Sequence, residues 1–591
     1  MLSRGFGFLM SAVAAATLIA CGDEPPVLLT GAVIDGYIEG ATVCLDENGD
    51  GKCGATEPSS VTDKDGKYSL VVSAGQENKF ILVDVPATAK DSDDGGRTLA
   101  AAGKSAYIMS APASLPQVVS PLTTLMVGKI KADGLTLSEA RVRVLDELGL
   151  PAETDLHSDH VKAGDVQVHA MARQFAARLQ ETKRELGADG SDPLTAMSKK
   201  LKDQNAALGE PVTKQPAALM NIPNDLALTA DGKLLLYSMI SATGKPIVAS
   251  AMLFTPKAPA PQGGRPLIVI GAGTTGIAGI CAPSNIMQGL GFLPYGELIK
   301  TLIGEGFAVV MPDYEGRGPA GVPGLPDAHP YLHVGSAGNA MVLSAVASKR
   351  LLGSALSGAW AAWGHSQGGH AALAAAQFAG LGERLEPSLD YRGAIAVAPA
   401  SHFAESVQGL LSMASQAQAQ AAFGYLGTLG FYASYIVQGS RSTASPLDPN
   451  EVLGAQMKPV HSSAGSDCLE AYFDKVQAAV TSFAGSGGQP SSFGAVDAAK
   501  IASPKVLAAL RSLEPGRVKL PGKTLLLQGS VDTTVLPVTT QALEMVMKGR
   551  GSDVSLTLVS GDDATHSGVL DMPEAQQAML GHIGALFGLS N

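Results

Sequence analysis

The chain has 591 residues, too many for one hydrophobic core, so about two or three domains are expected. Hydrophobic residues make up 46% of the chain and aromatic residues 5%, which indicates a folded α/β protein and argues against a disordered one. The net charge is −12 and no run of lysine or arginine occurs, which argues against nucleic acid and an anionic membrane surface as partners.

The first 20 residues have the pattern of an export signal. Met1–Arg4 is a short positive segment, residues 5–20 are apolar, and Leu18-Ile19-Ala20 precedes Cys21. This ending resembles the lipobox of bacterial lipoproteins, in which the signal peptide is cut before a cysteine that then carries lipid. We therefore expect an exported protein that Cys21 anchors to a bacterial membrane, at the outer membrane or the cell surface. An ordinary secretory signal is the alternative. No later segment reaches about 18 apolar residues, so no transmembrane helix is expected.

The cysteines fit an oxidising compartment. Five occur, and lipidation of Cys21 leaves an even number. Cys44 and Cys53 lie close together around one loop and are expected to form a disulfide. That leaves Cys281 to pair with Cys468. No Cys-x-x-Cys motif or Cys/His cluster indicates zinc.

Short strands between Gly, Asp and Asn turns predict a tether and a small β-sandwich over residues 21–96. The pattern resembles the carboxypeptidase-regulatory-like modules of bacterial surface proteins. One of its loops matches the calcium-binding pattern D-x-[DN]-x-[DN]-G-x5-E. The candidate ligands of a structural calcium ion are Asp46, Asn48, Asp50, Lys52 through its carbonyl, and Glu57. The alternative is an acidic hairpin turn closed by the first disulfide.

Residues 97–215 have the apolar spacing of helices and predict a helical region of unassigned role. From residue 216 to 591, apolar strand candidates alternate with helices. These candidates are Leu234–Ile240, Pro246–Phe254, Pro266–Gly271, Phe307–Met311, Ala359–Gly364, Gly393–Ala398, Lys523–Gln528 and Val554–Val559. This order predicts an α/β-hydrolase fold, a mostly parallel sheet covered by helices on both faces. The interruption over residues 401–501 is expected to form a cap or lid.

The segment Gly364–Gly368 reads Gly-His-Ser-Gln-Gly and lies between a buried strand and an Ala-rich helix. Strand, G-x-S-x-G and helix is the context of a nucleophile elbow, which identifies Ser366 as the nucleophile. The turn is so tight that only glycine is expected two positions before and two positions after the serine.

The serine needs a base and an acid, and in this fold they follow the serine in the order acid, then histidine. Asp532 follows one predicted strand and His566 follows the next. We assign His566 as general base and then acid, and Asp532 as the group that orients its imidazole. Asp562 and Asp563, which share the histidine loop, are alternative acids.

The oxyanion hole is expected to combine the Gln367 N–H with a backbone N–H from the glycine-rich loop over residues 271–276. Thr275 is favoured as the second donor, with Gly276 as the alternative.

Several motifs together resemble the secretory lipases of the fungal lipase A type and their bacterial relatives, over about residues 220–590. They are Gly273–Gly276, Cys281–Ser284, Pro312–Gly316, His329–Tyr331 and Trp363–His370. The resemblance implies hydrolysis of carboxylic esters or triacylglycerols, a lid over the acyl site and no catalytic cofactor. In that family a disulfide joins the cysteine of the Cys-Ala-Pro-Ser motif, here Cys281, to a cysteine after the lid, which agrees with the Cys281–Cys468 pair.

The leading hypothesis is therefore a lipid-anchored serine ester hydrolase that acts through an acyl-enzyme. A serine peptidase or a thioesterase is the first alternative, because the same triad serves them. A surface-binding lipoprotein with an inactive hydrolase domain is the alternative from another class. The sequence indicates neither the natural ester nor the oligomeric state.

Overall fold

The computed structural model describes residues 25–589 except 149, 151–152, 187–192, 291–294, 320–321, 323–327 and 444–445. The predicted signal peptide and Cys21 lie outside the described residues. No helix in the described part of the chain is long and apolar enough to cross a membrane.

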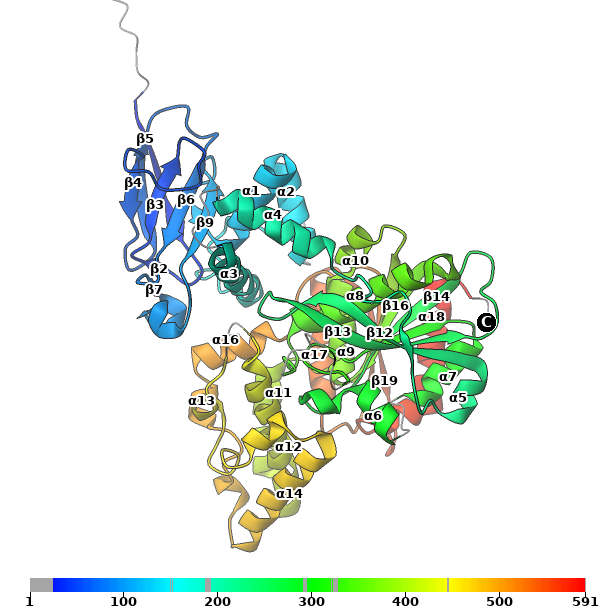
Figure 1. Ribbon diagram of the computed structural model, residues 1–591. Helices are drawn as coiled ribbons and strands as arrows, with labels where there is room; N and C mark the ends of the chain where they lie inside the picture. The colour runs from blue at the N-terminus through cyan, green and yellow to red at the C-terminus, as the bar shows by residue number, and fades with distance from the viewer. Residues whose placement is uncertain are drawn as a thin grey trace, which may run out of the picture.

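The N-terminal strands form small sheets that pack around a common core (Figure 1). Strand β5 (Lys67–Val72) alternates exposed and buried side chains, the pattern of a strand with one face on a core. One sheet has the order β10-β1-β5, with β10 at Val118–Val119 and β1 at Val27–Val33. Another has the order β4-β3-β6-β9, at Ser59–Val61, Thr42–Asp46, Phe80–Val85 and Tyr107–Pro112. A third joins β2, β7 and β8, at Ile38–Glu39, Lys90–Asp91 and Arg97–Thr98.

The sheets extend beyond the expected boundary at residue 96. Strand β9 pairs with β6, and β10 pairs with β1, so the sheet region ends at Val119. Every residue of β9 is buried, so this strand lacks the alternation by which a half-buried strand is recognised in sequence. The helical region begins after it with α1 (Pro121–Asp133), where Ser120 and Thr123 form a reciprocal N-terminal cap. The other helices are α2, α3 and α4, at Leu137–Leu148, Val166–Leu186 and Pro193–Ala206.

The C-terminal part is built on a sheet of nine strands in the order β11-β12-β13-β15-β14-β16-β17-β18-β19. From β15 to β19 all neighbours are parallel, and β11, β12 and β13 add an antiparallel edge. The strands are Ala217–Ala218, Ala230–Ile240, Pro246–Pro256, Ala308–Pro312, Arg265–Gly271, Leu356–His365, Asp390–Val397, Lys523–Gly529 and Asp553–Val559. The predicted α/β-hydrolase fold is confirmed; only the two-residue β11 was not among the expected strands.

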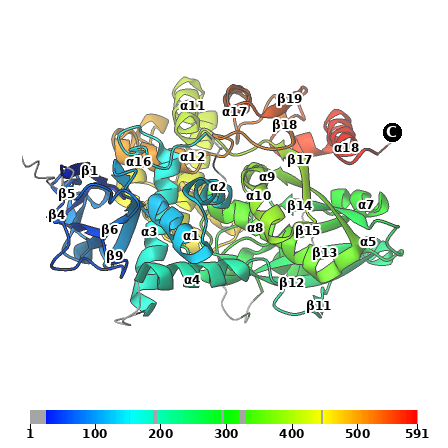
Figure 2. The same ribbon diagram turned by 90° about the horizontal axis from the view of Figure 1, so that it is seen from above.

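Helices cover both faces of this sheet (Figure 2). Helices α8 (Val334–Leu352) and α9 (Gln367–Gln377) pack together on one face, and α7 (Gly296–Gly304) and α18 (Pro573–Phe587) lie on the other. The central strand β16 shows why both faces must be covered, because Trp360 and Trp363 are fully buried on opposite sides of it. The remaining helices of this part are α5, α6, α10 and α17, at Asn224–Thr229, Pro283–Leu290, Ala379–Leu385 and Pro537–Gly549.

The segment between β17 and β18 forms a helical cap with a core of its own. In Figure 1 it is the yellow and orange lobe below the helical region. Its helices are α11, α12, α13, α14, α15 and α16, at Phe403–Gln416, Ala419–Ser440, Pro449–Val452, Leu469–Gly485, Ala498–Ile501 and Pro504–Ser512. The rings of Phe431, Tyr435 and Tyr472 pack against one another within it. Helix α16 contacts α3, so the cap also touches the N-terminal helical region.

Candidate active site

The predicted nucleophile lies in a strained turn between β16 and α9. Ser366 has φ 59° and ψ −119°, a conformation that non-glycine residues rarely adopt. A Cβ atom on Gly364 would lie 1.9 Å from the Gly368 carbonyl oxygen, and one on Gly368 would lie 1.9 Å from the Gly271 carbonyl oxygen. The expectation that only glycine fits at these two positions agrees with this geometry. The turn places Ser366 at the N-terminus of α9, where the helix dipole favours negative charge.

The predicted acid and base lie in loops at the carboxyl ends of two neighbouring parallel strands, β18 and β19. The Nδ1 atom of His566 is 2.7 Å from Oδ2 of Asp532, and the Asp532 side chain is fully buried. The other carboxylate oxygen of Asp532 accepts the backbone N–H groups of Thr534 and Val535 at 2.8 and 2.9 Å. A carboxylate oxygen can only accept, so the hydrogen bond to Asp532 holds the proton of His566 on Nδ1 and leaves Nε2 free to accept one.

The alternative acids do not share this position. Asp562 and Asp563 are exposed in the loop before His566, and neither is hydrogen-bonded to its ring.

Two residues that the sequence analysis did not assign connect the loops around Ser366. The Nε2 atom of His365 is 2.8 Å from the backbone oxygen of His566, so this ring fixes the base loop beside the elbow. Burial lowers the pKa of His365 to about 3 and keeps the ring neutral. Its Nδ1 atom therefore accepts from the Tyr295 hydroxyl at 3.3 Å, and that hydroxyl accepts the Gly273 N–H at 3.0 Å. The position of His365 next to the nucleophile was the only signal for this role in the sequence.

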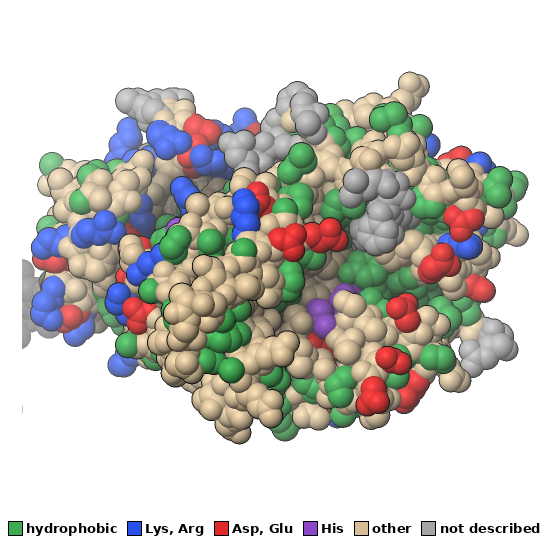
Figure 3. Space-filling view, turned by 90° about the horizontal axis from the view of Figure 1, so that it is seen from below, with side chains coloured by type: hydrophobic (Ala, Val, Ile, Leu, Met, Phe, Trp, Pro, Cys, Tyr) green, Lys and Arg blue, Asp and Glu red, His purple; other side chains and the backbone are tan. Residues whose placement is uncertain are grey.

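These contacts bring Ser366 and His566 to the same edge of the sheet. Among the described residues, no hydrogen bond joins the Ser366 hydroxyl to the His566 ring. Active-site hydrogen bonds are commonly loose in the free enzyme and shorten when substrate binds. On the face shown in Figure 3, histidine side chains lie at the bottom of a hollow with hydrophobic and acidic side chains around it.

The loop after β14 reaches both the elbow and the cap. Its first part meets the elbow, since a Cβ atom on Gly273 would lie 3.4 Å from the His365 carbonyl oxygen. The two expected oxyanion residues lie farther along, against the cap. The Thr275 carbonyl accepts the N–H of Leu469 at 2.9 Å, and Gly276 forms an isolated β-bridge with Cys468. The assignment of Thr275 or Gly276 as the second oxyanion donor stays a prediction.

Gln367, the other expected oxyanion residue, is the first residue of α9 and is buried. Its backbone N–H belongs to the first turn of the helix, where no carbonyl of the helix can accept it. The assignment of this N–H to the oxyanion hole stays a prediction.

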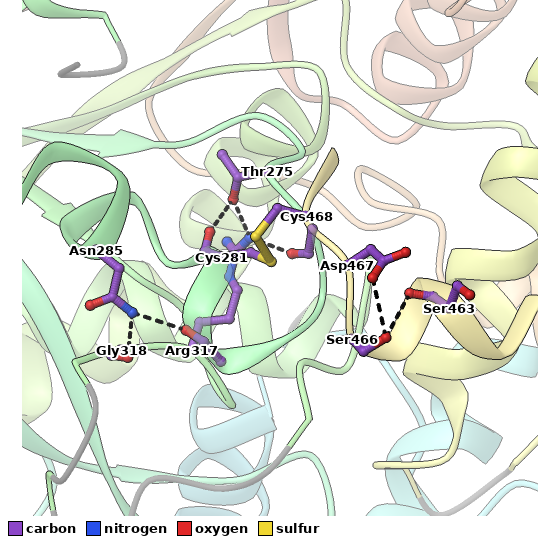
Figure 4. Close-up of a disulfide and its surroundings, with 11 residues drawn as sticks. Thr275, Cys281, Asn285, Arg317, Gly318, Ser463, Ser466, Asp467 and Cys468 are labelled. Atoms are coloured by element: carbon purple, nitrogen blue, oxygen red, sulfur yellow. Dashed lines mark hydrogen bonds between the residues drawn. A yellow bond between two sulfur atoms is a disulfide. The ribbon is translucent and has the colours of Figure 1, made fainter. Parts of the chain in front are cut away.

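Both predicted disulfides are present. Cys44 and Cys53 have Cα atoms 5.6 Å apart, and Cys281 and Cys468 have Cα atoms 5.3 Å apart. The second disulfide joins the start of α14 in the cap to the segment after the Thr275–Gly276 loop, as Figure 4 shows. It therefore ties the cap covalently to the loop that is expected to stabilise the oxyanion.

The loop proposed for calcium is organised by its own backbone. The Glu57 carboxylate accepts the N–H groups of Glu47 and Gly54 at 2.9 and 2.8 Å, and Asp46 accepts the Gly51 N–H at 3.3 Å. The expected ligands Asn48, Asp50 and Lys52 hydrogen-bond to one another around the turn. In the part of the chain that the structure describes, no three His, Cys, Asp or Glu side chains are placed to hold a metal ion. The predicted set also includes the Asn48 side chain and the Lys52 carbonyl, and calcium binding stays a prediction.

Comparison with known proteins gives only distant similarities. No family model and no curated protein matches the sequence. A ligand-bound form of the rice cell wall degrading esterase LipA from Xanthomonas oryzae is 21% identical, with a TM-score of 0.45, over 64% of this chain and 97% of that one. A hydrolase from Legionella pneumophila is 14% identical, with a TM-score of 0.47, over 64% and 98%. Candida antarctica lipase A is 14% identical, with a TM-score of 0.46, over 66% and 87%.

Proposed function

We propose that this protein is a serine ester hydrolase, a carboxylesterase or lipase, in which Ser366, His566 and Asp532 form the catalytic triad. The observation that carries the proposal is the buried Asp532–His566 pair at the sheet edge where Ser366 occupies a strained turn. A histidine that is hydrogen-bonded to a buried carboxylate can act as a general base. A serine at a nucleophile elbow needs such a base to accept its hydroxyl proton.

The reaction follows from these positions. Ser366 Oγ attacks the ester carbonyl carbon while His566 Nε2 takes the hydroxyl proton. His566 returns that proton to the departing alcohol, which leaves an acyl group on Ser366. Water then attacks the acyl-enzyme and gives its proton to His566, and the carboxylic acid is released as Ser366 regains a proton. Asp532 stays ionised throughout and stabilises the imidazolium.

Each attack places negative charge on the carbonyl oxygen. The Gln367 N–H, at the N-terminus of α9, is one donor for this oxyanion, and an amide of the 271–276 loop, Thr275 with Gly276 as the alternative, is the other. No catalytic cofactor is required by this chemistry.

Export and anchoring are part of the proposal. Two disulfides are expected to persist only in an oxidising compartment, and Cys21 follows a lipobox-like signal. Metabolic labelling of the producing bacterium with an alkyne fatty acid should mark the wild-type protein in the membrane fraction and leave Cys21→Ser unmarked. A labelled Cys21→Ser variant would remove the lipid anchor from the proposal.

The catalytic assignment is tested with a fluorophosphonate probe and a substrate panel. The probe should label the wild-type protein, and Ser366→Ala should be unlabelled. The panel compares p-nitrophenyl esters of several acyl lengths with acyl thioesters and aminoacyl-anilides. Activity on the anilides or thioesters alone would replace the esterase assignment by a peptidase or thioesterase. An unlabelled wild-type protein without activity would leave a surface-binding lipoprotein.

A further inference from the structure

The loop that follows β15, Asp313–Arg317, contacts one of the two segments that are expected to supply oxyanion donors and reaches the other through His329. We propose that this loop sets the position of both oxyanion donors. It holds the 271–276 loop through its own Arg317, and it holds Gln367 through His329, which is bonded to the Glu315 carbonyl. The inference rests on the proposed function and adds positioning residues to it.

The first contact holds the loop after β14. Arg317 is fully buried, and its Nη1 atom donates to Thr275 Oγ1 at 2.7 Å and to the Gly276 carbonyl at 2.9 Å (Figure 4). Its Nε atom donates to the Asp313 carbonyl at 2.8 Å, so the guanidinium spans the two loops. A planar guanidinium can hold acceptors in several fixed directions, which a lysine ammonium cannot do. The Tyr314 hydroxyl adds a hydrogen bond to the Ala272 carbonyl at 3.0 Å.

The second contact holds the residue after the nucleophile. The Nδ1 atom of His329 is 3.0 Å from the Glu315 carbonyl oxygen, which can only accept, so Nδ1 carries the proton. The Nε2 atom is therefore an acceptor, and the side-chain amide of Gln367 donates to it at 2.6 Å. The ring stacks on Tyr314 with centroids 5.6 Å apart. Burial and the nearby Arg317 charge lower the pKa of His329 well below its usual value, which keeps this acceptor available.

The loop itself is fixed to the sheet and to neighbouring helices. The Asp313 carboxylate accepts both the hydroxyl and the N–H of Ser284, at 2.6 and 2.8 Å, and the hydroxyl of Ser250 at 2.6 Å. The Glu315 carboxyl accepts the Ala242 N–H at 2.8 Å and the Ser336 hydroxyl at 2.5 Å. A rigid support of this kind matters because a misplacement of about 1 Å at a reacting centre can lower a rate about 100-fold.

Three variants separate positioning from stability. Arg317→Lys removes the guanidinium fork, and His329→Phe removes the acceptor for Gln367. Thr275→Val removes one acceptor of Arg317 and the donor to the Cys281 carbonyl, while retaining the backbone amide. Each is expected to lower kcat on a p-nitrophenyl ester about 10- to 100-fold with KM within about 3-fold, because the donors act on the transition state. The inhibition constant of a trifluoromethyl ketone, which mimics that state, should rise by the same factor.

Matched controls lie away from the 271–276 loop that is expected to supply an oxyanion donor. Arg265→Lys removes a guanidinium fork at the opposite end of β14, where Arg265 donates to the carbonyls of Ala258, Pro259 and Gly306. His582→Phe replaces a partly buried histidine in α18. Both are expected to change kcat less than about 3-fold even where the melting temperature falls, because neither touches the oxyanion loop.

A double-mutant cycle tests the His329 path by itself. If His329 acts through the Gln367 side chain, His329→Phe should lower kcat much less in a Gln367→Met background than in the wild type. Equal losses in both backgrounds would overturn this path. Variants that match their controls in kcat and in inhibitor affinity would overturn the whole inference. A wild-type protein that the fluorophosphonate probe does not label would instead overturn the proposed function. Thr275→Val changes no backbone atom and leaves the Arg317 hydrogen bond to the Gly276 carbonyl in place, which keeps the test available if the other variants do not fold.

Discussion

Replacing Asp532 by Asn should abolish catalysis by fixing His566 in the wrong tautomer. One carboxylate oxygen of Asp532 faces the N–H groups of Thr534 and Val535, so the oxygen of the new amide will occupy that position. The amide nitrogen must then face His566 Nδ1, where the carboxylate oxygen lay 2.7 Å away. An NH₂ group there requires an unprotonated Nδ1, which moves the ring proton to Nε2.

With Nε2 protonated, His566 cannot accept the proton of Ser366. This amide orientation also sets the new NH₂ group against the Gln528 Nε2 donor, 3.0 Å from Asp532 Oδ2, whereas the opposite orientation sets it against two backbone N–H groups and costs more free energy. A tautomer error of this kind lowers kcat about 10⁴-fold, which corresponds to about 5 kcal/mol in the activation barrier. The assay is kcat on a p-nitrophenyl ester together with the rate of fluorophosphonate labelling, with Asp562→Asn as the exposed control. An Asp532→Asn enzyme that keeps a tenth of the wild-type rate, or an equal loss in the control, would refute this reasoning.

Three further changes have expected outcomes. Gly364→Ala would place a Cβ atom 1.9 Å from the Gly368 carbonyl oxygen, so we expect a lower melting temperature and no measurable hydrolysis. A variant with the melting temperature of the wild type would show that the elbow can relax around the added methyl group. Replacing both Cys281 and Cys468 by serine removes a disulfide that links positions 187 residues apart, and loop-closure entropy predicts a loss of about 5 kcal/mol in the free energy of unfolding. The midpoint of urea unfolding should fall, and an unchanged midpoint would contradict this value. Burial raises the pKa of Glu315 from its ordinary 4.5 to about 8. Between these two values the folded state retains a proton that the unfolded state has lost, so the free energy of unfolding should fall as the pH rises from about 4.5 to about 8. Glu315→Gln should flatten this dependence in urea titrations at about pH 5 and about pH 8; a variant with the wild-type slope would assign the effect to another group.

The parts of the fold that follow local rules were predictable. The strand before Ser366 and the helix after it carry their pattern in adjacent residues, and glycine at 364 is required by a close approach within the same turn. Gly368, by contrast, is required by the close approach of Gly271 at the end of β14. Asp532 and His566 were found because parallel strands bring the loops at their carboxyl ends to one edge.

Contacts between distant segments were not predictable. His365 meets the backbone of His566, and Tyr295 lies between His365 and Gly273, through loops that only the folded sheet brings together. The role of Thr275 was expected from its place in a glycine-rich loop, yet its side chain and carbonyl are engaged by Arg317 and Leu469. Nothing local in the sequence indicates that a buried arginine 42 positions later will contact that loop.

The order of strands in the large sheet has a consequence for the cell that makes the protein. The elbow is synthesised long before its base, since His365 and His566 lie 201 positions apart. At about 5–20 residues per second, a ribosome needs roughly 10–40 s to cover that distance. Until the end of this interval Ser366 has no histidine to pair with from the loop after β19, because that loop does not yet exist. The proposed triad can therefore form only after translation has passed β19 and the loop that follows it.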